Sequence, residues 1–279
     1  RGGNSEYEEH EPSLEEKTAK WEETLKPLLA EDPCVLKLSG KYISNDDVKI
    51  ICDYQGLAKV RALDLSDNQI SDDVLLTIFE SENLVQIEEL FLGINFLTGQ
   101  GLIDIAGSNE IKLENLKKLV VSDNRLTDLS VAEFMRSKNF PNLESLDIGW
   151  NEVGNETAKA LGEVSAFASL QCLEMERGYI EIEALKEMVQ GSLMDQLQDL
   201  DLSANKLKDE GVQVLALASK WKSLKALRLS QNMFGDDGAK ALGESVSLAG
   251  LTQLYIGRNY FGAEGAQAIY ESKTITGLK

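Results

Sequence analysis

Histidine is almost absent from this chain, because His10 is the only one in 279 residues. A chain with one histidine has little material for Ser-His-Asp or Cys-His nucleophilic schemes, or for a histidine-rich metal site. The sequence also contains neither a Gly-x-x-x-x-Gly-Lys-Ser/Thr loop nor a Gly-x-Gly-x-x-Gly turn after a strand. We therefore predict that the protein is not an enzyme and has no catalytic, cofactor-binding or metal-binding residues.

Cysteine and long apolar runs are scarce as well. Cys34, Cys52 and Cys172 make an odd number without close pairs. This pattern favours reduced thiols and a cytoplasmic location over a disulfide framework. There is no apolar run of about 18 residues, so we expect no membrane-spanning helix and no membrane partner.

Positive charge is in deficit, since the formal net charge is −19. Nucleic acid is therefore a poor partner, because binding it requires basic groups that neutralise phosphates. A basic or mixed-charge protein is favoured as the partner. The alternative is that the acidic surface serves solubility alone.

What the sequence does contain is an asparagine that returns every 27 residues or nearly so. Each one closes the phrase Leu-x-x-Leu-x-Leu-x-x-Asn, at Asn68, Asn95, Asn124, Asn151, Asn205, Asn232 and Asn259. One further copy has Gly178 in place of the asparagine, and a degenerate first copy has Lys41 there. Nine copies at a fixed period predict a solenoid of stacked repeats.

Within a repeat, the apolar period changes from that of a strand to that of a helix. Pairs such as Leu63 and Leu65 alternate with polar residues, which places them on one face of a strand. Helix-compatible runs such as 212–218 and 239–245 follow each asparagine. Small residues six positions after it, as at Gly238, are expected to start the helix and let it lie close to its neighbour. We predict an α/β, right-handed horseshoe with parallel strands on the concave face and helices on the convex face.

The asparagine itself has a structural interpretation. Its side chain can donate and accept, so it can satisfy the backbone of its own loop and of the adjacent one. Its loss at Gly178 fits either a local kink or a functional irregularity.

The chain resembles the leucine-rich repeat proteins, specifically the ribonuclease-inhibitor-like subclass. The resemblance is carried by tails such as NKLKDEGVQVLA at 205–216 and NMFGDDGAKALG at 232–243, and it covers about residues 34 to 279. That subclass includes enzyme inhibitors, GTPase activators, immune sensors and bacterial effectors. The resemblance thus implies a protein-binding module, with a GTPase-activating regulator or a target-recognition segment of a larger effector or receptor as alternatives. For a secreted effector the location would be the host cytosol.

The two ends differ from the repeats. We expect a disordered acidic tail at 1–12 and an N-terminal capping helix at 13–33, in which Ser13 and Glu16 have capping-box spacing. An amphipathic partner-binding helix is the alternative, and Pro27 suggests that the helix bends or ends there. About nine repeats fill 34–279, and Leu278 would open a tenth strand. We expect the natural chain to continue, or a second copy to cover this edge, so the protein is a monomer or a dimer through it.

A partner is expected on the concave face, where strand residues that point away from the core form columns. One column passes from apolar Phe91 and Val120 through three acidic residues to Arg228 and Tyr255. Exposed apolar residues that cluster commonly mark an interface, and Trp, Tyr and Arg often carry binding energy. The predicted protein-binding residues are Phe91, Ile94, Val120, Asp147, Trp150, Glu174, Arg177, Asp201, Arg228, Tyr255 and Arg258. The alternatives are that Phe91, Ile94 and Trp150 only pack on neighbouring repeats, and that a partner binds the convex helices instead.

Overall fold

One parallel sheet runs the length of the chain. The computed structural model describes residues 10–163 and 166–279, so most of the tail expected at 1–12 lies outside the described residues. Nine strands pair in sequence order, each parallel to the next. The strands are β1 (Val35–Lys37), β2 (Ala62–Asp64), β3 (Glu89–Phe91), β4 (Lys118–Val120), β5 (Ser145–Asp147), β6 (Cys172–Glu174), β7 (Asp199–Asp201), β8 (Ala226–Arg228) and β9 (Gln253–Tyr255).

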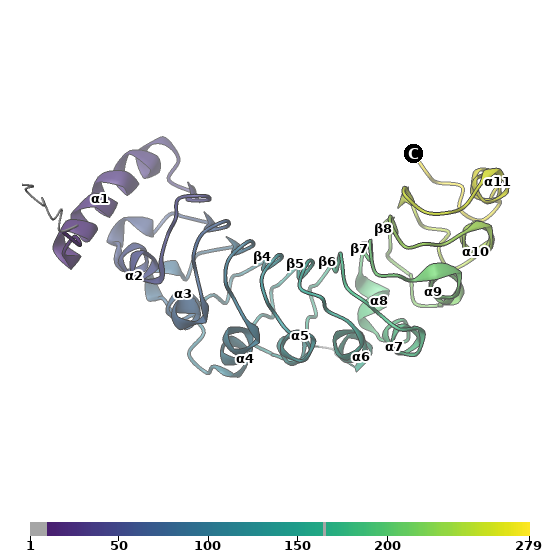
Figure 1. Ribbon diagram of the computed structural model, residues 1–279, viewed down its shortest axis with the longest axis horizontal. Helices are drawn as coiled ribbons and strands as arrows, with labels where there is room; N and C mark the ends of the chain where they lie inside the picture. Colours follow the sequence, from purple (N-terminus) through teal and green to yellow (C-terminus); the bar gives the residue numbers. More distant parts are fainter. Residues whose placement is uncertain (1–9, 164–165) are drawn as a thin grey trace, which may run out of the picture.

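The helices lie on the other side of the chain path. Figure 1 shows the strands along the inner edge of an arc and the helices along its outer edge. The α-helices are α1 (Leu14–Glu31), α2 (Asn45–Asp53), α3 (Leu75–Phe79), α4 (Gly99–Gly107), α5 (Asp128–Met135), α6 (Asn155–Glu163), α7 (Ile182–Met188), α8 (Leu193–Gln196), α9 (Lys208–Leu217), α10 (Asp236–Glu244) and α11 (Ala263–Tyr270). The short 3-10 helices are η1 (Gln55–Leu57), η2 (Asp72–Val74) and η3 (Glu82–Leu84). The predicted α/β solenoid of parallel strands and helices is confirmed.

The repeated leucines form one continuous core. In eight of the nine strands the middle leucine is 0–1% exposed, and these leucines belong to a single hydrophobic cluster. A single short strand cannot bury its leucines, so the stacking of neighbouring repeats buries them and stabilises the fold. The exception is Leu254, which is only half-buried because β9 is the last strand of the sheet, and Ile256 just after this strand is half-buried as well. That a second copy covers this edge stays a prediction, which light scattering at high protein concentration would test.

The asparagines join successive loops as expected. The side-chain nitrogen of Asn151 donates to the carbonyl oxygens of Val121, Ile148 and Gly149 at 3.0–3.2 Å. Its Oδ1 accepts from the backbone N–H groups of Asn124 and Leu126, both at 3.1 Å. Each buried asparagine therefore satisfies backbone groups of its own repeat and of the repeat before it.

The sixth repeat, which carries Gly178, interrupts this ladder of asparagine hydrogen bonds. A Cβ placed on Gly178 would lie 2.2 Å from the carbonyl oxygen of Val153 and 2.8 Å from Oδ1 of Asn205. The loop of the sixth repeat thus lies too close to its neighbours at Gly178 for any side chain. Asn205 is fully buried, and its Oδ1 is one of two buried side-chain atoms in the described residues without a hydrogen-bond partner. The irregularity is a close approach of backbone, with one acceptor left unpaired.

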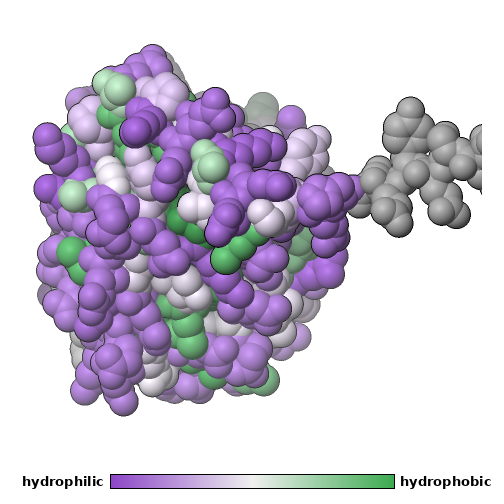
Figure 2. Space-filling model, turned by 90° about the vertical axis from the view of Figure 1, so that its left-hand side faces the viewer, coloured by the Kyte–Doolittle hydropathy of each residue, from purple (hydrophilic) through white to green (hydrophobic). Residues whose placement is uncertain are grey.

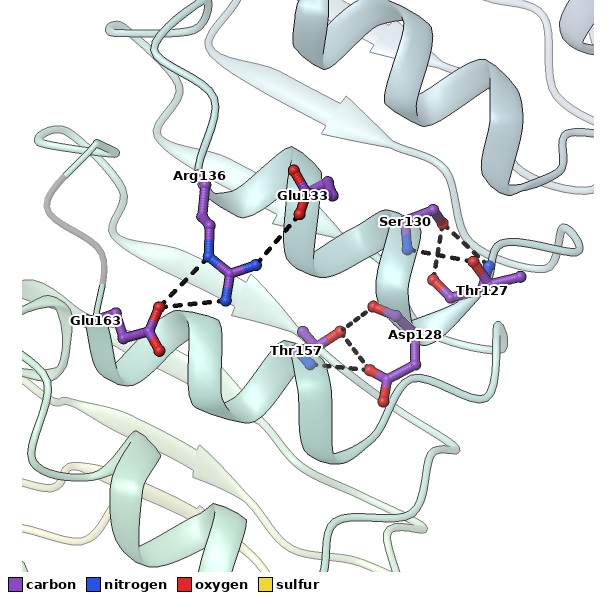
Figure 3. Close-up of polar contacts among 7 residues, drawn as sticks. All are labelled: Thr127, Asp128, Ser130, Glu133, Arg136, Thr157 and Glu163. Carbon is purple, nitrogen blue, oxygen red and sulfur yellow. Dashed lines mark hydrogen bonds and ion pairs between the residues drawn. The ribbon is translucent and has the colours of Figure 1, made fainter.

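On the convex side, an acidic residue of one repeat caps the helix of the next. Asp128 accepts hydrogen bonds from the backbone N–H groups of Gly154, Glu156 and Thr157 at 2.9 Å, and from Oγ1 of Thr157 at 2.7 Å. Figure 3 shows its contact with Thr157, beside an Arg136 that bridges Glu133 and Glu163. These bonds satisfy amides that a helix start leaves open.

The same arrangement explains the recurring glycines. Asp209 accepts from the N–H groups of Gly235 and Gly238 at 2.7 and 2.9 Å. A Cβ on Gly238 would lie 2.9 Å from Oδ1 of Asp209. The expectation that such glycines start the helix is wrong, because α10 already begins at Asp236. At Gly101, Gly238 and Gly265 the missing side chain leaves room in the first turn for the capping carboxylate.

Helix α1 packs across the N-terminal end of the sheet. Ser13 and Glu16 form a capping box, Leu25 is fully buried, and Nε1 of Trp21 donates to Asp47 at 2.9 Å. The helix continues through Pro27 to Glu31, so it does not end at the proline. A hollow of about 610 Å³ remains between α1 and α2. Figure 2, which views the molecule from this end, shows apolar patches set in a mostly hydrophilic surface.

Candidate protein-binding face

The third residue of each strand forms an in-register column on the concave face. Direct pairs join Phe91 to Val120, Asp147 to Glu174, and Arg228 to Tyr255. The middle leucines point into the core, so strand alternation turns this column to the opposite, solvent-facing side. Its members are half-buried or exposed, and neither Asp147 nor Glu174 is sealed inside. The column places seven of the eleven predicted binding residues on one open face.

Three carboxylates on adjacent strands give this face its electrostatic character. Asp147, Glu174 and Asp201 are successive partners in the sheet. Burial and the neighbouring charges of Asp147 and Asp201 raise the pKa of Glu174 to about 7. The backbone N–H groups of Gly149 and Ser203 hold Asp147 and Asp201 in place at 2.9 and 2.8 Å. Glu174 therefore titrates near neutral pH, at the centre of the cluster.

One cation closes the acidic stretch. Nε and Nη2 of Arg228 donate to the two carboxylate oxygens of Asp199 at 3.2 and 2.9 Å. Its guanidinium also lies 4.7 Å from the ring centroid of Tyr255. The hydrogen bonds that Arg228 donates to Asp199 raise the pKa of Arg228 despite some burial, so this arginine stays charged. Arg228 is thus held on this face by two hydrogen bonds to one carboxylate and by the aromatic ring beside it.

A second column, immediately before each asparagine position, forms a rim beside the strands. Here Ile94, Trp150, Arg177 and Arg258 all have left-handed φ values, between 54° and 61°. The N–H groups of Ile94, Trp150 and Arg177 donate to the next loop, as from Trp150 to the carbonyl oxygen of Glu176 at 2.7 Å. Strand alternation could not assign the direction of these side chains. Ile94 and Trp150 prove to be about half exposed, at 52% and 45%.

Sequence reasoning missed the column just after the asparagine. Tyr42, Phe96, Tyr179 and Tyr260 occupy it, and all four are exposed. Cations from neighbouring repeats lie over two of these rings, Arg125 over Phe96 at 5.7 Å and Lys206 over Tyr179 at 5.3 Å. Aligning the repeats on the asparagine would have shown four aromatic residues in one column, which was the available signal.

Basic groups also stack on the predicted aromatic residues. The guanidinium of Arg177 lies 4.0 Å from the ring centroid of Trp150, and Nζ of Lys118 lies 5.3 Å from that of Phe91. Such contacts contribute roughly 0.5–1 kcal/mol each at exposed sites. The face therefore combines two kinds of surface. Asp147, Glu174 and Asp201 form an acidic floor, and aromatic and basic residues lie along its rim.

The described residues contain little that could support other chemistry. No group of three or more metal-ligating side chains occurs among residues 10–163 and 166–279. No helix in that part of the chain is long and apolar enough to span a bilayer. The three cysteines are free, and burial raises the pKa of Cys52 to about 12 and also raises that of Cys172. Neither of these two thiols is therefore activated as a nucleophile.

Comparison with known proteins gives a family match. The profile described as a leucine-rich repeat matches residues 56–75, 141–162, 197–216 and 222–243. No curated protein matches the sequence. Among solved structures, a plant peptide hormone receptor, RGFR1, in complex with RGF2 matches with 20% identity and a TM-score of 0.43. The match covers 81% of this chain, which spans 32% of the receptor chain.

Proposed function

This chain is a leucine-rich repeat protein, and we propose that it is a non-catalytic module that binds a protein partner on its concave face. The ribonuclease-inhibitor-like subclass, which rests on the quoted tails alone, is part of the proposal. The observation that carries the proposal is the open column of Phe91 to Tyr255. It sets apolar, acidic and basic side chains side by side on seven adjacent strands.

Rigidity supports a binding role for this surface. The column is fixed by strand pairing on one side and by the buried leucines on the other, so little ordering entropy is lost when a partner binds. A standard interface needs roughly 800 Å² from each protein, which several adjacent strands supply. The acidic floor favours a partner with basic or mixed charge. The three free thiols support a reducing, cytoplasmic compartment.

The test compares concave with convex substitutions in capture of a partner by the full chain. Phe91→Ala, Trp150→Ala and Glu174→Arg each change the concave face or its rim. Leu217→Ala and Tyr270→Ala are matched controls, because both side chains are highly exposed and lie in the helices α9 and α11. We expect the concave variants to lose the partner that the controls retain, by about tenfold or more for a central aromatic residue. If all three concave variants bind as the wild type does, the concave proposal is wrong and the convex helices become the candidate.

A further inference from the structure

A hollow lies on the rim, beyond the carboxyl ends of β5 to β8. It has a volume of about 730 Å³. Four successive repeats line it, through Glu152, Arg177, Gly178, Tyr179, Lys206 and Met233 among others. We call it the rim hollow. It adjoins the acidic floor, because Arg177 follows Glu174 by three residues at the end of β6.

Two cations face the rim hollow without a carboxylate partner. Among residues 10–163 and 166–279, neither Arg177 nor Lys206 takes part in an ion pair. Aromatic rings hold them instead, since Arg177 lies 4.0 Å from the centroid of Trp150 and Lys206 lies 5.3 Å from that of Tyr179.

The geometry suits a carboxylate. A guanidinium stacked against an indole is held by its face, which leaves the N–H groups along its edge for a planar acceptor. Both cations are exposed, so a ligand reaches them without rearrangement of the backbone. Tyr179 and Met233 add apolar wall for the methylene groups of an acidic side chain. Glu152 also lines the hollow, and its charge opposes an incoming anion.

The broken asparagine ladder lies at the same place. Gly178 lines the rim hollow, and behind it is the unpaired Oδ1 of the buried Asn205. A Cβ on Gly178 would meet both neighbouring repeats, at the carbonyl oxygen of Val153 and at Oδ1 of Asn205. The one internal repeat without its asparagine thus contributes the loop that carries Arg177.

We propose that the rim hollow binds an aspartate or glutamate side chain of the protein partner, between Arg177 and Lys206. This proposal rests on the protein-binding function above and deepens it. The partner then carries an acidic residue that meets the rim beside a basic residue that meets the floor, and the two contacts fix its orientation on the repeats.

A titration of the full, ¹⁵N-labelled chain tests the site without the partner. The probe is N-acetyl-glutamate N-methylamide, which ends in one carboxylate, and the matched control is the uncharged glutamine compound. Both are added at constant ionic strength. The indole N–H of Trp150, one of three tryptophans, and the Nε–H of Arg177 report on the rim hollow. We expect the glutamate compound alone to shift both signals saturably.

Four variants make the test specific. Arg177→Met and Lys206→Met should each weaken the probe by about threefold or more, since a partly exposed charge pair contributes only modestly. Glu152→Gln should tighten it by about twofold, because a repelling charge is removed. Arg125→Met is the matched control: Arg125 also lies over an aromatic ring but is not among the lining residues, so affinity should not change.

Three results would overturn the proposal. They are a shift that never saturates, an equal saturable shift with the glutamine compound, and unchanged affinity in both Arg177→Met and Lys206→Met. The spectra show whether each variant is folded. If the probe does not bind but capture of the partner still depends on Phe91 and Trp150, only the proposal for the rim hollow is wrong. If the probe binds but the concave variants capture the partner as well as the wild type does, the concave binding function is wrong and the carboxylate site remains.

Discussion

The Oδ1 of Asn151 accepts a hydrogen bond from the backbone N–H of Asn124 at 3.1 Å, so two asparagines one repeat apart are joined directly. The same bond links Asn205 to Asn232 at 2.9 Å and Asn232 to Asn259 at 2.8 Å. The backbone N–H of Gly178, one repeat before Asn205, makes no such bond, and Oδ1 of Asn205 has no hydrogen-bond partner. A ladder of backbone-to-side-chain hydrogen bonds therefore links the repeats, and it is interrupted on both sides of Gly178.

The first prediction compares two rungs of this ladder. Asn151→Ala removes five hydrogen bonds and leaves buried backbone groups without partners, so it should lower the free energy of unfolding by about 2–4 kcal/mol. Asn205→Ala removes three, all made by its nitrogen, and should cost about 1 kcal/mol less. Urea unfolding followed by circular dichroism measures both. Equal losses would contradict the assignment of Oδ1 of Asn205 as unpaired.

The second prediction concerns the close approach at Gly178 in the sixth repeat. Gly178→Ala brings a methyl group to within 2.2 Å of the carbonyl oxygen of Val153, and the loop must move. We expect a loss of about 1–3 kcal/mol in the free energy of unfolding, typical of overpacking. Gly107→Ala is the matched control, because a Cβ there meets nothing within 4 Å. The control should be neutral or slightly stabilising, since alanine restricts the unfolded chain.

The third prediction concerns the cap that one repeat gives the next helix. Asp128→Ala leaves the first amides of α6 without acceptors and should cost about 1–2 kcal/mol in thermal or urea unfolding. Asp104→Ala, whose carboxylate meets only the exposed Gln100, should change stability little. A loss in both variants of the same size would show that the cap is not the cause.

The contribution of Asp128 should also depend on pH. Burial opposes ionisation, but the hydrogen bonds from Gly154 and Thr157 outweigh it, so the pKa of Asp128 is lowered below its usual 3.8. A folded pKa below the unfolded one stabilises the protein above the unfolded value, and this stability is lost as the pH falls through the folded pKa. The difference between the wild type and Asp128→Asn should therefore shrink in acid, measured by urea unfolding at pH 7 and below pH ~3.

The fourth prediction concerns the centre of the acidic floor. The pKa of Glu174 rises from 4.5 to about 7 in the folded chain, so the native state holds a proton that the unfolded state releases. Stability should fall as the pH rises from about 4.5 to about 7, and this slope should be absent in Glu174→Gln. Urea midpoints at pH 5, 6, 7 and 8 would show it. Glu183→Gln is the control, because that side chain is 81% exposed.

Binding of a basic partner should follow the same titration. If the concave proposal holds, the floor gains a negative charge as Glu174 ionises, and affinity for a basic segment should increase from pH 6 to pH 8. The measured fold-change should vanish in Glu174→Gln. An affinity that is flat over this range in the wild type would place the basic contact elsewhere.

Much of this arrangement could be predicted from the sequence, because residues with the same structural role recur at a fixed spacing along the chain. Leu63 and Leu90 had to share a core once their strands stacked, and Asn151 had to face the loop that it satisfies. The same logic placed Asp147 and Glu174 on the open face, where the structure has them half-buried. The sequence predicted helix boundaries less well, since Pro27 lies inside α1 and Gly238 lies inside the first turn of α10.

The sequence by itself determined the period, the strand and helix of each repeat, the shared core and the column of outward side chains, because all of these follow from alternation within one repeat. Only the tertiary structure decided what residues 27 apart do to one another. It set Arg177 against Trp150, raised the pKa of Glu174 between two aspartates, drew Gly178 against Val153 and left a hollow on the rim. Those features depend on distances between neighbouring coils, which the left-handed loop residues set and which no pattern inside a single repeat contains.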